Sequence, residues 1–157
     1  LLEDELETII EAEAWEMALP DAEALAARVF AAARAREPRL MGSAALLLTG
    51  DAAVRDLNAR FRGKDAPTNV LSFPSDEPAP GFLGDIALGY ETCAREAREK
   101  GVALADHAAH LIAHGLLHLV GYDHIEDADA EEMERLETEI LAGLGVSDPY
   151  RLEEFED

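Results

Sequence analysis

All five histidines of the chain lie between His107 and His124, and three of them have a spacing that suits a metal ion. His114 and His118 are four residues apart, so on a helix their imidazole rings project from successive turns of one face. His124 follows Gly121, a residue that allows the chain to turn back toward that face. Three imidazole nitrogens leave the fourth position of a tetrahedral zinc ion for water, as in catalytic zinc sites. We therefore predict that His114, His118 and His124 bind one Zn²⁺ ion.

Zinc proteases use the same ligand spacing in the motif H-E-x-x-H-x-x-G-x-x-H, where a glutamate base follows the first histidine. In this chain that position is Gly115. A base of this kind contributes typically about 10²–10⁴-fold to the rate. Zinc itself lowers the pKa of bound water toward about 7, so hydrolysis does not require the glutamate. A phosphodiester is a more suitable substrate than a peptide, because a metal and an arginine can stabilise the charge that develops on phosphate oxygens.

The other polar residues near the motif are expected to support it. His110 is also four residues from His114, but a helix separates the outer members of a 110–114–118 set by about 12 Å along its axis. We therefore expect His110 either to contact the ligands or substrate, or to have a plain structural role. Asp85 and Asp123 are candidates to orient a ligand imidazole. Asp123 could instead serve the turn, and Asp85 could cap a neighbouring turn.

Composition suggests an ordinary globular chain. Its 157 residues suit one domain, 1–157, and no apolar run approaches the length of a membrane span. The only cysteine is Cys93, which favours a reducing compartment, so we expect a cytoplasmic protein. The net charge of −21 argues against a polyanionic partner, but the charge is uneven. Residues 28–64 hold eight Arg and Lys against three acids, so nucleic acid remains an open partner class.

Hydrophobic periodicity predicts strands and helices in irregular order, which indicates an α+β fold. A helix that begins near Asp21 should end before Pro38, and the histidine helix should run from about Leu104 to Leu119. The last helix has Asp129 and Glu132 as a possible capping pair. Further expected elements are strands at 7–15 (or a helix start), 43–49, 69–74 and 83–89, a helix after Gly50 with Val54, Leu57 and Phe61 as its apolar residues, and a helix at 90–100.

Four segments of the chain together resemble one known family. They are LNARFRGKDAPTNVLSFP (57–74), LGDIAL (83–88), HGLLHLVGYDH (114–124) and EDADAEEMERLETEIL (126–141). This combination is similar to the YbeY family, bacterial endoribonucleases of rRNA maturation, and the likeness covers nearly the whole chain past the first 40 residues. Gly115, unusual beside the protease motif, is the residue that this family carries at that place.

The resemblance implies an α+β fold, with a small mixed β-sheet flanked by helices and a zinc site formed by the three histidines. It implies that Arg62 is the functionally required arginine. The implied substrate is single-stranded RNA, chiefly precursor small-subunit rRNA at its 3′ end, with a role in ribosome quality control. The implied partners are the small ribosomal subunit, one of its proteins, and the GTPase Era.

The predictions for the residues around Arg62 are less specific. Arg60 and Lys64 are expected to face RNA phosphates beside Arg62, for which the alternative is an ion pair at a helix end. We expect Phe61 in the core, Asn58 as a hydrogen bonder at the helix end, and Ser72, Phe73 and Pro74 on a strand edge beside the cleft. Two other functions stay open: a ribosome-assembly factor that binds RNA around a mainly structural metal, and a metallopeptidase, which Gly115 disfavours.

Overall fold

The computed structural model describes residues 5–75, 81–123 and 126–150. Within these ranges the chain forms a four-stranded sheet and a set of helices around it. The elements are β1 (Leu6–Ile10), α1 (Glu13–Ala18), α2 (Ala22–Arg36), β2 (Ser43–Thr49), α3 (Asp51–Arg62), β3 (Val70–Pro74), β4 (Phe82–Gly89), α4 (Tyr90–Lys100), α5 (Leu104–Leu119) and α6 (Asp127–Ala142).

The sheet is mixed, with strand order β1-β2-β4-β3. β1, β2 and β4 run parallel, and β3 pairs antiparallel with β4 at the edge of the sheet. A mixed sheet with helices that do not alternate regularly with the strands confirms the α+β prediction. The edge position of β3 leaves one side of Ser72, Phe73 and Pro74 without a neighbouring strand, as expected.

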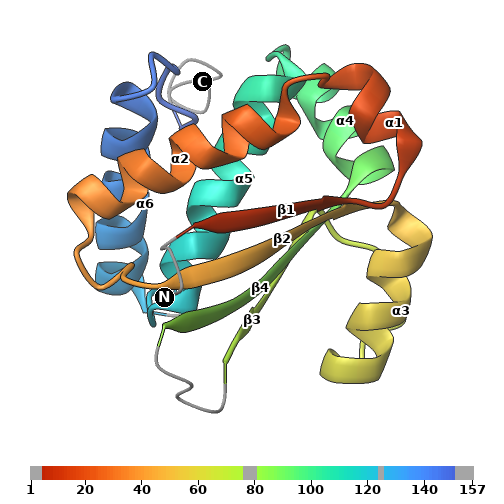
Figure 1. Cartoon of the computed structure of the whole chain (residues 1–157), viewed down its shortest axis with the longest axis horizontal. Coiled ribbons are helices and arrows are strands. Elements are labelled where there is room, and N and C mark those ends of the chain that lie inside the picture. The colour runs from red at the N-terminus through yellow and green to blue at the C-terminus, as the bar shows by residue number, and fades with distance from the viewer. Residues whose placement is uncertain (1–4, 76–80, 124–125, 151–157) are drawn as a thin grey trace.

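The main core lies on one face of the sheet, beneath α2, α5 and α6 (Figure 1). On β2 every second residue, Ala44, Leu46 and Leu48, is buried on this face, because side chains alternate along a strand. α5 is the central helix: it contacts α2, α4 and α6 as well as β3 and β4. Because most residues of α5 are buried, only its partly exposed side can contact a ligand.

The opposite face of the sheet is covered only in part. α3 packs there over a small cluster formed by Val54, Leu71 and Ala87. Phe61, in the last turn of α3, extends beyond this cluster and is 65% exposed, so the prediction that it belongs to the core is wrong. Phe61 packs there against the ring of Phe73, edge to face at 5.6 Å between centroids, and stays largely exposed.

Element boundaries agree with the periodicity in most places. α5 spans Leu104–Leu119 as predicted, and the 7–15 segment divides into β1 and the short α1, which was not predicted as a separate helix. The last helix begins at Asp127, so Asp129 and Glu132 lie inside its first turns and the predicted capping pair is wrong. No helix in the described ranges has the length and apolar character needed to cross a membrane.

Candidate functional site

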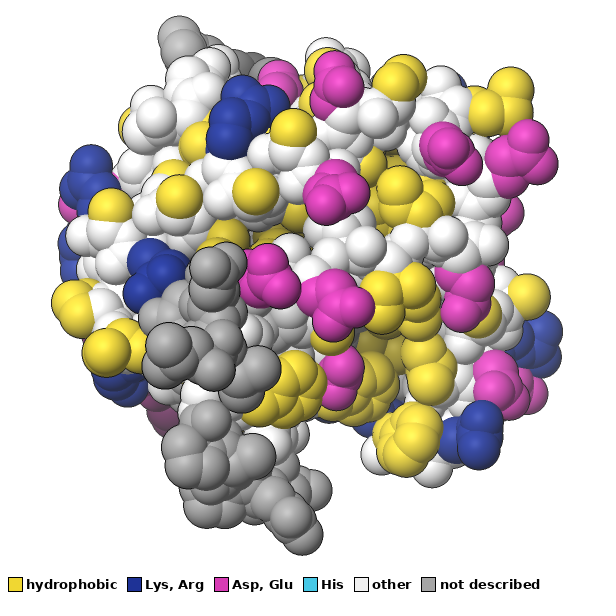
Figure 2. Space-filling view, in the orientation of Figure 1, with side chains coloured by type: hydrophobic (Ala, Val, Ile, Leu, Met, Phe, Trp, Pro, Cys, Tyr) yellow, Lys and Arg dark blue, Asp and Glu magenta, His cyan; other side chains and the backbone are white. Residues whose placement is uncertain are grey.

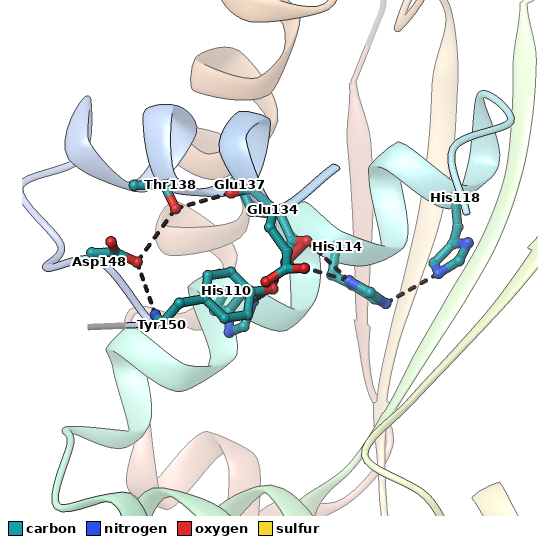
Figure 3. Close-up of polar contacts among 8 residues, drawn as sticks. All are labelled: His110, His114, His118, Glu134, Glu137, Thr138, Asp148 and Tyr150. Carbon is teal, nitrogen blue, oxygen red and sulfur yellow. Dashed lines mark hydrogen bonds and ion pairs between the residues drawn. The ribbon is translucent and has the colours of Figure 1, made fainter. Parts of the chain in front are cut away.

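His114 and His118 lie side by side on α5, at the margin of its buried face. Their Nε2 atoms are 3.1 Å apart (Figure 3). Two nitrogens bound to one tetrahedral zinc ion, each at about 2.0–2.1 Å, lie about 3.3 Å from each other. The pair therefore fits two of the ligands of a zinc ion with almost no rearrangement.

The predicted third ligand, His124, lies outside the described residues. In the parts that the structure describes, no group of three or more His, Cys, Asp or Glu side chains is placed to hold a metal. The chain does turn back after α5 as expected: Gly121 has φ +101°, and its N–H donates to the carbonyl of His118 at 3.1 Å. Asp123, the last described residue before His124, lines the same groove as His114 and His118.

A buried carboxylate at the end of α2 anchors this turn. Tyr122 donates its hydroxyl to Oε1 of Glu37 at 2.8 Å, and Arg39 donates its guanidinium to the same oxygen at 2.9 Å. The hydrogen bond from Arg39 is the main reason that the pKa of Glu37 is lowered to about 2. Residues 85 positions apart in the chain thus hold the described part of this turn against the end of α2.

Glu137 of α6 is the site residue that the sequence analysis missed. Its side chain is 1% exposed and sits against α5, where Oε1 is 2.6 Å from Nε2 of His110 and Oε2 is 3.3 Å from Nδ1 of His114 (Figure 3). Tyr150 donates its hydroxyl to Oε1 at 2.9 Å. Burial alone would raise the pKa of Glu137, but the hydrogen bonds from His110 and His114 outweigh it and hold the pKa at about 2.

The two histidines nearer the start of α5 each have a carboxylate partner. His110 has its Nε2 on Glu137, so the structure places it behind His114. His107 has its Nε2 2.9 Å from Oε1 of Glu96, which also accepts a hydrogen bond from Asn69. Burial lowers the pKa of His107. His107 therefore belongs to the packing between α4 and α5, and His110 belongs to the network around the candidate ligands.

Gly115 lets α5 approach the sheet closely. A Cβ atom built at this position would lie 3.0 Å from Cγ2 of Ile86 and 3.2 Å from Oγ of Ser72. The position that holds the base in zinc proteases thus faces strands β4 and β3, and a glutamate has no room there. Close packing of α5 on the sheet therefore explains the glycine at position 115. The groove has no general base at this position.

A groove of about 810 Å³ runs past the two histidines, and its other wall comes from the end of α3 and from β3. Arg62 and Lys64 both line it, on either side of Gly63, which ends α3 with φ +70°. Arg62 donates to the carbonyl oxygen of Ser72 and makes no ion pair among the described residues. Asn58 holds the following loop by donating to the carbonyl of Ala66 at 2.8 Å, as expected of a hydrogen bonder at the helix end.

Two predicted residues lie away from this groove. Arg60 forms an exposed ion pair with Asp56 at 3.3 Å and does not line the groove. Asp85 pairs with Phe73 across the sheet, on the face opposite Ile86 and α5. It lines a separate hollow of about 720 Å³ with Phe61, so the expectation that it supports the histidines is wrong. Arg62 lines both the groove and this hollow.

Comparison with known proteins places this geometry in a family. The family model for the endoribonuclease YbeY matches residues 9–145. The chain belongs to the YbeY family. An endoribonuclease YbeY from Bradyrhizobium sp. (strain BTAi1) is 53% identical over 154 residues, which cover 92% of this chain and 90% of the relative. One from Paramagnetospirillum magneticum is 51% identical over 147 residues, covering 87% and 90%.

A solved structure supports the same fold. A solution structure from Thermotoga maritima superimposes with a TM-score of 0.58 at 25% identity, covering 92% of this chain and 97% of that one. The small mixed sheet flanked by helices is therefore shared with this protein. The matched residues include α3, β3 and the whole of α5, so the family match spans both walls of the groove.

Proposed function

We propose that this protein is a zinc-dependent, single-strand-specific endoribonuclease. Its proposed task is maturation of the 3′ end of small-subunit rRNA, together with ribosome quality control. The observation that carries the proposal is that one groove is lined both by Arg62 and by His114 and His118, whose Nε2 atoms are paired. The printed name of the relatives, endoribonuclease, supports RNA as the substrate class.

Different residues would bind the metal ion and the phosphate. His114 and His118 would hold the zinc ion from α5, with His124 as the proposed third ligand. A bound zinc ion would supply a Lewis acid and lower the pKa of a water molecule toward about 7. Arg62 keeps one N–H on the carbonyl of Ser72. A guanidinium has five N–H donors, so this contact holds the group in place and leaves others to neutralise the scissile phosphate.

The groove also suits a single strand better than a duplex. Lys64 and Arg62 offer positive charge within it, and the exposed ring of Phe61, the residue before Arg62, lines the hollow beside it. Proteins that bind single-stranded nucleic acid combine such charges with aromatic rings on which unpaired bases stack. Arg60 lies beside Phe61, with its guanidinium 5.8 Å from the ring centroid, and is a weaker candidate for phosphate contact because Asp56 already pairs with it.

Membership of the family supports the proposed setting. We infer that residues 1–157 act as one domain in the cytoplasm, on precursor small-subunit rRNA within or beside the small ribosomal subunit. One protein of that subunit and the GTPase Era are the proposed protein partners. The runner-up is an assembly factor that binds the ribosome while its metal is structural. A metallopeptidase is disfavoured, because the position of the protease glutamate faces the sheet.

The test is cleavage of a single-stranded fragment of precursor rRNA by protein whose metal content has been measured. His114→Ala and Arg62→Ala should each abolish cleavage, while Arg95→Ala, which removes an exposed arginine of α4 outside the groove, should retain most of it. Equal cleavage by all four proteins would reveal a contaminating nuclease. Intact RNA with all four, together with ribosome binding that survives in Arg62→Ala, would favour the assembly factor.

A further inference from the structure

A buried carboxylate on α6 lies directly behind the candidate metal ligand His114. We propose that Glu137 is a positioning residue, which holds His114 in the tautomer and ring orientation that present Nε2 to the metal. This inference rests on the proposed function, because it assigns a role toward the proposed zinc ion. Carboxylates that accept the second N–H of a metal-binding histidine are a recurrent device in zinc sites.

The hydrogen bonds around Glu137 determine which nitrogen of His114 carries the proton. A carboxylate can only accept, and Glu137 lies 3.3 Å and 3.4 Å, through its two oxygens, from Nδ1 of His114. A neutral imidazole has one N–H, so donation from Nδ1 leaves the lone pair on Nε2. That Nε2 is the atom that lies 3.1 Å from Nε2 of His118. The carboxylate thus selects the tautomer that a metal requires.

The charge of Glu137 supports the same role. The group is 1% exposed, and its partners at ion-pair distance among the described residues are His110 and His114, which carry charge only when protonated, and no lysine or arginine. An ionised carboxylate buried without a cationic partner is costly. A divalent ion on the far nitrogen of His114 would place positive charge one imidazole ring away, and would compensate the carboxylate through that ring.

The segment after α6 completes this network. Tyr150 donates its hydroxyl to Glu137, and its own backbone N–H donates to Oδ1 of Asp148 at 2.8 Å (Figure 3). Its ring also packs edge to face on His110, 5.5 Å between centroids. Tyr150 lies beyond residue 145, where the family match ends. The position of Glu137 is therefore braced by a part of the chain outside the matched region.

Metal affinity is the first measurement. Zinc binding is measured by competition with a chromophoric chelator for the wild type, Glu137→Gln and the matched control Glu96→Gln. Glu96 of α4 accepts a hydrogen bond from His107, which lies on α5 as His114 does. Glu96 does not contact His114. We expect Glu137→Gln to bind zinc about 10–100-fold more weakly and Glu96→Gln to bind it like the wild type. Equal affinity of Glu137→Gln and wild type would overturn the inference.

The tautomer of His114 is the second measurement, and it needs neither zinc nor a variant that folds. Nitrogen chemical shifts of the metal-free wild type should show the proton of His114 on Nδ1. A proton on Nε2 would overturn the role of Glu137. If the wild type binds no zinc but shows the Nδ1 proton, the proposed zinc function fails while the positioning of His114 stands.

Discussion

Gly115 shows how one residue can separate two chemistries that share a ligand spacing. The histidines on either side of it keep the zinc spacing of a protease, but its own Cβ direction points at Ile86 and Ser72. Helix α5 can lie this close to the sheet only because the side chain is absent. The position of the protease base therefore offers no catalytic group, and Arg62 on the other wall of the groove is the proposed catalytic residue.

We expect Gly115→Glu to destabilise the fold rather than create a peptidase. The new side chain would overlap Ile86 and Ser72 and would bury a carboxylate without a partner. The combined cost should exceed about 3 kcal/mol in the free energy of unfolding. Urea unfolding followed by the fluorescence of the single tryptophan, Trp15, measures it. A stable variant with peptidase activity would contradict both expectations.

Arg62 combines a positive charge with a planar group of N–H donors. Arg62→Lys keeps the positive charge but loses the planar fork that would let the side chain hold the carbonyl of Ser72 and the proposed phosphate at the same time. We expect the rate of RNA cleavage to fall by at least about tenfold, with little change in stability, because the side chain is exposed. Single-turnover cleavage at saturating RNA separates this effect from weaker binding. Arg55→Lys is the matched control, because Arg55 lies on the same helix, pairs with Asp65 of the following loop and does not line the groove.

At the scale of elements, α3 and β3 form a wall whose end is open to solvent. Figure 2 shows hydrophobic side chains gathered over the strands and beside α3, with acidic side chains among them. Phe61 and Phe73 meet here, and the guanidinium of Arg62 lies 5.4 Å from the ring centroid of Phe73. This combination of rings and cation borders the histidine groove through Arg62 itself.

We expect Phe61→Ala to weaken the binding of single-stranded RNA about tenfold, because one stacked base contributes roughly 1–3 kcal/mol. The free energy of unfolding should change little, since the ring is already 65% exposed. Fluorescence anisotropy with a labelled oligonucleotide measures the affinity. Phe82→Ala, an exposed phenylalanine at the start of β4, is the control and should bind like the wild type. Unchanged affinity in Phe61→Ala would remove this ring from the RNA path.

The net charge of −21 on the whole molecule determines where the surface can attract RNA. Acidic residues dominate the C-terminal part of the chain, while the groove wall from α3 and its following loop carries arginine and lysine. Attraction is therefore local to the groove, and the rest of the surface repels a polyanion. Such a distribution favours recognition of a particular site over tight non-specific binding.

Acid stability tests the network that joins α2 to the turn after α5. The folded pKa of Glu37 is about 2, well below its ordinary value of 4.5, because Arg39 and Tyr122 donate to the ionised form. The stabilisation is complete above pH 4.5 and is lost as the pH falls from 4.5 toward 2. We expect Glu37→Gln to be less stable at pH 7 and to lose less stability across that interval.

Urea unfolding at pH 7, 4.5 and 3 checks this expectation. Glu16→Gln, a change at an exposed residue of α1, should alter stability at pH 7 by less than about 0.5 kcal/mol. Parallel pH curves for Glu37→Gln and wild type would show that Glu37 does not carry the effect.

Much of the site was predictable from local patterns. The apolar period and the glycine after it predicted α5 to the residue, and the i, i+4 spacing predicted that His114 and His118 share a face. Local hydrogen bonding at the end of α3 likewise predicted the role of Asn58. These features depend on residues within a few turns of one another, so the order of residue types is enough to determine them. The four segments also determined the family.

The tertiary structure alone decided which distant groups meet the histidines. Glu137 lies on the buried face of α6, four residues after Met133 and three before Ile140, so its spacing could have marked it as an acid among apolar positions. Only the packing of α6 on α5 decides that it meets His114. The same is true of Asp85, whose face depends on strand pairing, and of Phe61, which is apolar but overhangs the sheet. The sequence shows which residues are apolar and how they are spaced along a helix or strand. Whether a partner surface reaches them depends on how the elements pack.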